Sequence, residues 1–265
     1  GGAPSGCSPS PVDNVFFDTN SFSLAGQTTT INIATAYCRD MTWTGVTNNP
    51  TLGGTFTNQL KIYGSLTFAA AMSQFFQGQV FFESAVPGNT ITSSGKSFLN
   101  AVTFNGGGGS WTLQDPLTCT NTLFLNNGTL NSNNQPVTAA TFNSSGTAPR
   151  TLNMGASVFT LTSPTFWNVN TSAGLTLNSG TSLINSTVNG NTAASFLGGG
   201  LAYYDLNFSG ATTQQGAIFD NNSFRHVNFA SNGVLYGSNT MINAVFNKNG
   251  VMEEIGRASC RERVS

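Results

Sequence analysis

The sequence predicts an all-β protein, and within that class a right-handed, single-stranded parallel β-helix (β-solenoid) with an N-terminal cap. Three observations predict it: short triplets that alternate apolar and polar residues, a regular spacing between them, and corners rich in Asn, Gly, Ser and Thr. Successive side chains of a strand point to opposite faces, so Val102 and Phe104 are expected to point into the core and Thr103 outward. The pattern is clearest over residues 97–143.

The spacing of the triplets predicts coils that stack on one another. Most triplets end in a Phe or Leu that lies 14 to 22 residues after the previous one. Repeats this short cannot bury their own apolar face and must stack on their neighbours. At ~20 residues per coil, the chain is expected to form about 12 coils. The residues expected to close the triplets inside the core are Phe68, Phe82, Phe104, Leu125, Phe142, Leu161, Leu177, Phe208, Phe229 and Phe246.

An antiparallel β-sandwich would share the short strands, and the turn chemistry argues against it. A sandwich of hairpins needs tight turns between most strands, and Asn-Gly is the strongest signal for such turns. Asn-Gly pairs recur only every 17 to 62 residues in this chain. The parallel solenoid is therefore favoured.

The expected elements begin after a short N-terminal segment. Residues 1–11 are small and Pro-rich and are expected to be flexible, whereas residues 12–253 are expected to form one β-helix domain. Residues 14–33 are expected to form two strands around a turn at Ala25-Gly26. Residues 37–51 are expected to form the N-terminal cap or the first coils, because an uncapped first coil leaves an open strand edge.

The following residues are expected to form coils without a linker. Residues 69–76 (AAAMSQFF) could form a short helix, but Gly64 and Gly78 bracket them closely, which favours strand, turn and strand. From Thr90 to Asn247 the coils are expected to run without interruption.

Composition limits the classes of partner. Only 7% of the 265 residues are charged, the formal net charge is −1, and 21 are Phe, which argues against disorder. There is no basic patch, so no nucleic-acid partner is expected. No apolar run approaches the ~20 residues of a membrane span. The N-terminus has no signal-peptide pattern, so any export signal is expected to be removed or to lie outside this chain.

The C-terminal tail differs from the rest of the chain. Residues 254–265 hold three Arg and two Glu, and their sequence matches what one frame of a common sequencing adapter encodes. We therefore expect this tail to be a sequencing-adapter artefact at the end of a metagenomic fragment, with the true C-terminus missing. Without the tail the net charge is −2.

Several phrases of the sequence resemble secreted β-solenoid repeat proteins of Bacteroidetes. These phrases are DNVFFDTNSF (13–22), CRDMTWTGVTNNPTL (38–52), LKIYGSLTF (60–68) and TITSSGKSFLNAVTFNGGGGSWTLQD (90–115). The resemblance implies export by a type IX secretion route, an extracellular or cell-surface location, and an adhesin-like role. It also implies neighbouring domains in a longer parent chain.

The cysteines allow one disulfide. Cys7 and Cys38 enclose a 30-residue segment, and in an oxidising compartment a bridge between them would contribute roughly 3 kcal/mol. The alternative is two buried thiols. Cys119 alternates with Leu117 and is expected to be an inward packing residue.

Two acidic residues form the best candidate for a catalytic pair. Glycoside hydrolases and polysaccharide lyases also use parallel β-helices, and the hydrolases need two carboxylates about 5–10 Å apart. Asp205 and Asp220 lie 15 residues apart and could stack on one face. His226 could act as a base oriented by Asp220, but an outward polar position in a strand explains this histidine fully and is the favoured interpretation. No metal-ligand cluster or cofactor motif is present, and no cofactor is expected.

Gly106 to Gly109 are expected to form a corner or bulge, because no Lys-Ser/Thr follows them as in a phosphate-binding loop. The many Asn are expected to form polar ladders along the coils. The sequence therefore predicts a structural or adhesive segment without catalysis, with an unknown surface or glycan ligand. The alternative is a carbohydrate-active β-helix, either a polysaccharide hydrolase or lyase or a glycan-binding module.

Overall fold

A computed structural model describes residues 8–253, which form strands and no helix. The chain is a parallel β-solenoid of about 10 turns. Every strand pairing within its two units is parallel, for example Val15 with Met41 and Phe208 with Phe229. This confirms the solenoid and excludes the antiparallel sandwich. The hand of the coil and the N-terminal cap stay predictions.

The chain divides into two compact units, residues 1–131 and residues 132–265, which we describe separately. The structure describes residues 8–131 of unit 1 and residues 132–253 of unit 2. The adapter-like tail at 254–265 and most of the N-terminal segment at 1–11 lie outside the described residues. The single domain over residues 12–253 stays a prediction.

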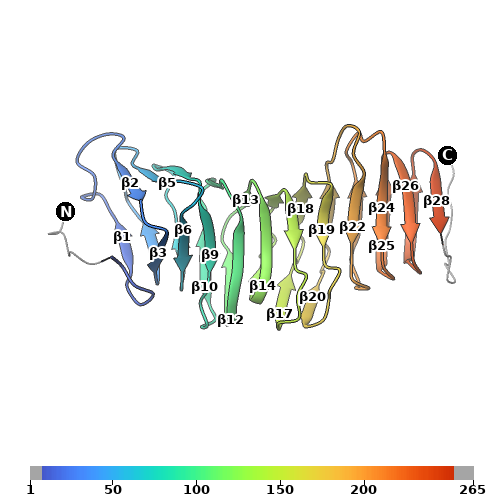
Figure 1. Cartoon of the computed structure of the whole chain (residues 1–265), viewed down its shortest axis with the longest axis horizontal. Helices are drawn as coiled ribbons and strands as arrows, with labels where there is room; N and C mark the ends of the chain where they lie inside the picture. The colour runs from blue at the N-terminus through green and yellow to red at the C-terminus, as the bar shows by residue number, and fades with distance from the viewer. Residues whose placement is uncertain (1–7, 254–265) are drawn as a thin grey trace. The chain divides into compact units, whose positions relative to one another are not determined.

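Unit 1 winds through three faces in each turn (Figure 1). The first face contains β1 (Val15–Phe17), β4 (Met41–Trp43), β7 (Leu66–Thr67) and β10 (Asn89–Thr92). The second contains β2 (Thr28–Ile31), β5 (Thr51–Gly54) and β8 (Ser73–Phe76), and later β11 (Ser97–Phe98) and β13 (Leu117–Cys119). The third contains β3 (Thr35–Cys38), β6 (Gln59–Ile62) and β9 (Gln79–Phe82). Two long strands, β12 (Val102–Leu113) and β14 (Thr122–Asn131), continue from the third face onto the first.

Unit 2 begins with three faces and ends with two. One sheet contains β15 (Val137–Ala139), β18 (Val158–Leu161), β21 (Leu183–Ser186), β23 (Asp205–Phe208), β25 (Ser223–Phe229) and β27 (Thr240–Phe246). A second face contains β16 (Thr141–Asn143), β19 (Thr165–Asn168), β22 (Ala194–Leu197), β24 (Gln215–Phe219), β26 (Asn232–Tyr236) and β28 (Gly250–Glu253). Among the described strands, the third face contains only β17 (Arg150–Asn153) and β20 (Leu175–Asn178).

Loss of the third face shortens the turns. Trp167 pairs with Phe196, 29 positions later, whereas Val234 pairs with Val251, 17 positions later. The expectation of about 12 coils was wrong, because it assumed ~20 residues per coil throughout. Turns that carry a third face use more residues, so the chain forms about ten.

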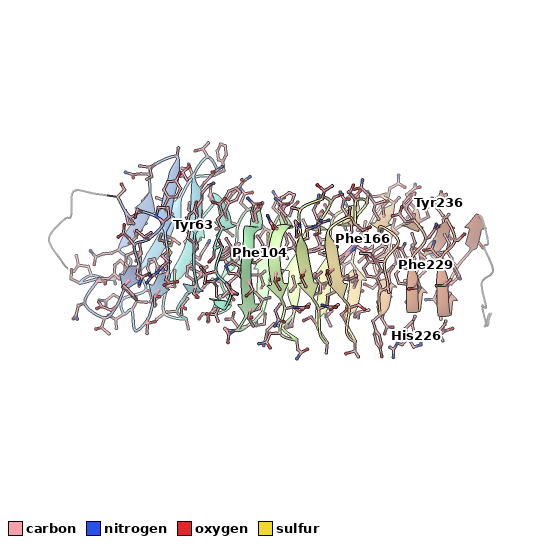
Figure 2. All side chains as sticks on the ribbon, turned by 90° about the horizontal axis from the view of Figure 1, so that it is seen from below. Tyr63, Phe104, Phe166, His226, Phe229 and Tyr236 are labelled. Atoms are coloured by element: carbon pink, nitrogen blue, oxygen red, sulfur yellow. The ribbon has the colours of Figure 1, made fainter. Side chains whose placement is uncertain are left out.

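Aromatic rings stacked one per turn fill the core. In unit 2, Phe208 and Phe229 are paired in register and their centroids lie 4.6 Å apart, and Phe246 continues the row at 4.9 Å. Figure 2 shows Phe104, Phe166 and Phe229 inside the coils, whereas His226 projects from the edge. Among the ten residues expected to close the triplets, only Leu177 and Phe246 are half-buried, and the others are buried. No described strand stacks on β20 from the following turn, which leaves Leu177 partly uncovered.

The four consecutive glycines form the expected bulge. The pairing of β12 with β14 shifts register between Phe104 and Asn105 and again between Asn105 and Ser110. A Cβ at Gly106 would lie 1.9 Å from the Ser84 carbonyl oxygen, and one at Gly109 would lie 2.0 Å from it. Glycine is needed at both positions because the backbone of the preceding turn approaches too closely for a side chain.

The expected Asn ladder is present on the outward face of unit 2. Asn207 Nδ2 donates to Asn185 Oδ1 at 3.0 Å, and Asn228 Nδ2 donates to Asn207 Oδ1 at 2.7 Å. The Asn207 amide both donates and accepts, so the ladder pairs the side chains of successive turns without using a charge.

Candidate functional site

The strongest concentration of ionisable side chains among the described residues of unit 2 lies at the start of β23 and on β25. We call it the Asp205 cluster (Tyr204, Asp205, Arg225 and His226). Register places Asp205 beside His226 on the next turn. Arg225 Nε donates to Asp205 Oδ1 at 2.8 Å, and Arg225 Nη2 donates to Oδ2 of the same carboxylate. The Arg225 guanidinium also lies 3.9 Å from the centre of the Tyr204 ring.

Asp205 is mainly the partner of Arg225. The two-point contact is the strong geometry for a guanidinium and a carboxylate. It raises the pKa of Arg225, with the hydrogen bond to Asp205 as the largest cause. His226 Nδ1 lies 3.6 Å from Asp205 Oδ1, which is beyond the usual range of a hydrogen bond. The His226 side chain is 47% exposed, so it remains accessible to a ligand from solvent.

Asp220 has different partners. It follows β24, on the other face of unit 2, with a φ of 74°. Its Oδ2 accepts the Gly199 N–H at 2.9 Å, which ties two successive turns together. The structure thus brings Asp205 together with Arg225 and His226, and it gives Asp220 a role at a corner. The pairing of Asp205 with Asp220 as catalytic acids stays a prediction without a contact to support it.

The partner of His226 could have been found from the repeat. In the sequence, Asp220 is the nearest acidic residue before His226, six residues away. In a solenoid the close neighbours lie one turn away, and Asp205 precedes His226 by 21 residues. Phe208 and Phe229 are also 21 residues apart, so the spacing of the core triplets gives the turn length that pairs Asp205 with His226.

Unit 1 holds a second paired cluster on its third face. Glu83 accepts hydrogen bonds from Lys61 Nζ at 3.0 Å and from Tyr63 Oη at 2.8 Å. Burial, followed by the contact with Glu83, raises the pKa of Tyr63 to about 12. Lys61 also lies 5.2 Å from the centre of the Phe81 ring. The ion pair between Lys61 and Glu83 leaves the cluster without net charge.

Arg150 is a buried cation that the sequence did not reveal. It is 2% exposed, and its guanidinium donates to neutral oxygens only: the Ser144 hydroxyl and four backbone carbonyls, of Ser144, Ala148, Thr171 and Ala173. Burial lowers its pKa. Arg150 thereby connects the corners of two successive turns, and its role is structural.

Trp167 and Tyr203, which would favour sugar binding if their rings were exposed in a row, are buried. Trp167 is 0% exposed and Tyr203 is 5% exposed. Trp167 Nε1 donates to Tyr203 Oη at 3.1 Å, and Tyr203 Oη donates to the Gly198 carbonyl at 2.8 Å. Both belong to the core because their polar atoms find internal partners. Tyr204 is covered by Arg225.

The two described cysteines are buried. Cys38 is 0% exposed, and burial together with the nearby Asp40 carboxylate raises the pKa of its thiol to about 12. Cys119 is 2% exposed, which confirms it as a packing residue. Cys7 lies outside the described residues, so the bridge between Cys7 and Cys38 stays a prediction.

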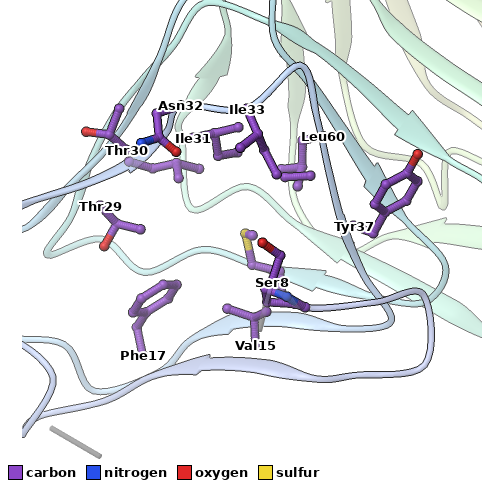
Figure 3. A pocket seen from close by; sticks show the side chains of 14 residues that line it. Ser8, Val15, Phe17, Thr29, Thr30, Ile31, Asn32, Ile33, Tyr37 and Leu60 are labelled. Carbon is purple, nitrogen blue, oxygen red and sulfur yellow. The ribbon is translucent and has the colours of Figure 1, made fainter. Parts of the chain in front are cut away.

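A cavity of about 230 Å³ lies at the first turn of unit 1 (Figure 3). Its walls are mainly apolar and come from β1 to β6, with Val15, Phe17, Ile31 and Leu60 among them. Its described lining contains no Asp, Glu, His, Lys or Arg, so it offers no acid–base group. The first-turn strands each pair on one side only within the described chain, and the cavity is the end of the core between them.

Within residues 8–253, no three or more His, Cys, Asp or Glu side chains gather closely enough to hold a metal ion. The same residues include no helix of the length and apolarity needed to cross a membrane. Comparison of the chain with family models, curated proteins and solved structures found no match.

Proposed function

We propose that this chain is a structural or adhesive segment of a secreted or cell-surface bacterial repeat protein, and that it performs no catalysis. The observation that carries the proposal is the character of the outward faces, which present uncharged polar residues in register, such as the Asn ladder from Asn185 to Asn228. Stacked turns of this kind form long, regular surfaces suited to contact with other macromolecules.

The state of the carboxylates also supports the proposal. Asp205 is held by Arg225, Glu83 is held by Lys61 and Tyr63, and Asp220 accepts a backbone N–H. A glycosidase of the common kind needs two carboxyl groups facing one another across a substrate. Only 7% of the residues are charged, and several phrases resemble secreted repeat proteins of Bacteroidetes. Both observations support the extracellular location.

A carbohydrate-active β-helix is the second candidate, and the Asp205 cluster favours it. An exposed imidazole 3.6 Å from a carboxylate is the arrangement from which a general base is built. In this role His226 would take a proton and Asp205 would orient it, while Asp220 would have no part.

Display of the whole chain on a non-adherent bacterium tests the proposed function. The chain is fused to an outer-membrane anchor, and the cells are passed over surfaces coated with polysaccharides, glycoproteins or other bacteria. We expect more cells to be retained on at least one surface than with the anchor alone. Retention equal to the anchor alone on every surface would contradict an adhesive role.

A further inference from the structure

The third face of unit 1 carries a row of outward side chains in which every second position is aromatic. The strand register aligns Tyr37, Lys61, Phe81, Thr103 and Phe124, one from each successive turn. We call this row the aromatic column. It faces away from the core, because its strand neighbours Leu60, Val80 and Leu123 are buried.

The rings of the aromatic column are partly open to solvent. Tyr37 is 37% exposed, and Phe81 and Phe124 are half-buried. Thr103 points outward as expected, yet it is only 5% exposed because it lies between Phe81 and Phe124 in register. Apolar rings at an outward position in every second turn are costly to leave in water, which indicates that they contact a partner.

The spacing of the rings is regular. Adjacent strands of a sheet lie about 4.8 Å apart, so side chains two turns apart repeat at roughly 9.6 Å. This is close to the length of two sugar rings in an extended, equatorially linked polysaccharide. Such a chain, laid across the strands, would present the apolar side of every second sugar to one ring of the column.

Hydrogen-bonding groups border the aromatic column on both sides. Gln59 and Gln79 are paired in register along one side, and Tyr63 and Glu83 follow on the other. Lys61 Nζ lies 3.0 Å from Glu83 Oε1, so the charges of these two side chains cancel. The pair therefore adds no net charge to the aromatic column or to the residues beside it. Amides and hydroxyls beside flat apolar rings match a ligand that is itself neutral and rich in hydroxyl groups. The same neutrality disfavours a nucleic acid, which needs unpaired cations.

We propose that the aromatic column binds an extended neutral polysaccharide, which runs across β3, β6, β9, β12 and β14 and stacks on Tyr37, Phe81 and Phe124. This inference rests on the proposed adhesive role and names the class of ligand for it. A lipid surface or a second copy of this chain would be other occupants of the same face.

Binding to insoluble polysaccharides tests the inference. The full chain is mixed with cellulose, xylan or chitin particles, and the bound fraction after sedimentation gives the affinity. We expect binding to at least one of them, and Phe81→Ala is expected to weaken it about tenfold. Phe81→Tyr, which keeps a ring, is expected to retain most of the affinity. Phe75→Ala is the matched control, because Phe75 is a 62% exposed Phe on the second face of the same unit, and it should leave binding unchanged.

Circular dichroism of each variant excludes unfolding as the cause of lost binding. If Phe81→Ala fails to fold, Phe124→Leu removes a ring while it keeps an apolar side chain. Absence of binding to all three polysaccharides would overturn the inference, as would equal binding by the wild type and the folded ring variants. Self-association or lipid-vesicle binding that Phe81→Ala removes, without polysaccharide binding, would also overturn it. If displayed cells still adhere to another surface, the adhesive role stands and only the polysaccharide assignment falls.

Discussion

Phe82 and Phe104 occupy paired register positions on adjacent turns, and their rings stack with centroids 5.1 Å apart and planes 13° apart. Trp111 lies against the same pair, with its centroid 5.4 Å from that of Phe104. All three side chains are 0% exposed. The stability of unit 1 therefore depends on contacts between turns, as expected for a solenoid whose coils cannot bury their own apolar faces.

Replacing a stacked core ring by a charge is expected to unfold neighbouring turns. Phe104→Asp in unit 1 and Phe208→Asp in unit 2 each remove a buried ring and bury a carboxylate, at a cost of about 4 kcal/mol or more. The measurement is the melting temperature by circular dichroism, with Phe75→Asp as the exposed control. An unchanged melting temperature in either core variant would contradict the inward assignment.

Removal of the Arg150 guanidinium is expected to destabilise unit 2 by about 3 kcal/mol or more, because Arg150→Met leaves several buried carbonyl oxygens without a donor. Urea unfolding monitored by fluorescence measures the loss. Arg39→Met is the control, since the Arg39 side chain is 53% exposed and its ion pair with Asp40 contributes little. Equal stability of the two variants would show that Arg150 does not connect the turns.

The bulge predicts a strict need for glycine at Gly106. Gly106→Ala would place a Cβ against the Ser84 carbonyl, so the two turns must separate at a cost of about 1–3 kcal/mol. Gly146→Ala serves as the control, because a Cβ there meets nothing within 4 Å. Thermal melts of both variants check the difference. A larger loss in Gly146→Ala than in Gly106→Ala would refute the close approach.

Stability is expected to fall at alkaline pH as Cys38 titrates. Its folded pKa of about 12 lies above the ordinary thiol value of 9.0, so the folded state keeps a proton that the unfolded chain has lost. The corresponding stabilisation is complete below about pH 9 and disappears as the pH rises through about 12. Melting temperatures measured across this range under reducing conditions should fall more steeply for wild type than for Cys38→Ala. Parallel slopes would contradict a buried, protonated thiol.

The sequence predicted the solenoid because its core residues recur once per turn and alternate with polar ones. Phe104 and Phe208 could be placed inside by this pattern alone. The number of turns could not, because the third face enlarges some turns without changing the triplets, as between Trp167 and Phe196. Periodicity reports which residues face inward, and it does not report how much chain lies in the corners.

The candidate sites were less predictable for a related reason. Asp205 and His226 meet only because their strands pair in register, which requires the turn length at that point to be known. Arg150 begins β17 and shares its inward face with the buried Leu152, but a charged residue type does not by itself indicate burial. Trp167 and Tyr203 lie in the core, where the polar atom of each side chain has an internal partner that the sequence pattern does not identify.

The central claim is that this chain is a structural or adhesive segment and performs no catalysis. Its most direct test is whether the chain releases reducing ends from polysaccharides. The purified chain is incubated with cellulose, xylan, chitin and pectin across pH 4 to 9, beside Asp205→Asn and His226→Ala variants. Our account predicts that none of the three proteins releases reducing ends above the rate without protein. Release by the wild type that either substitution abolishes would contradict it, and would make the Asp205 cluster an active site.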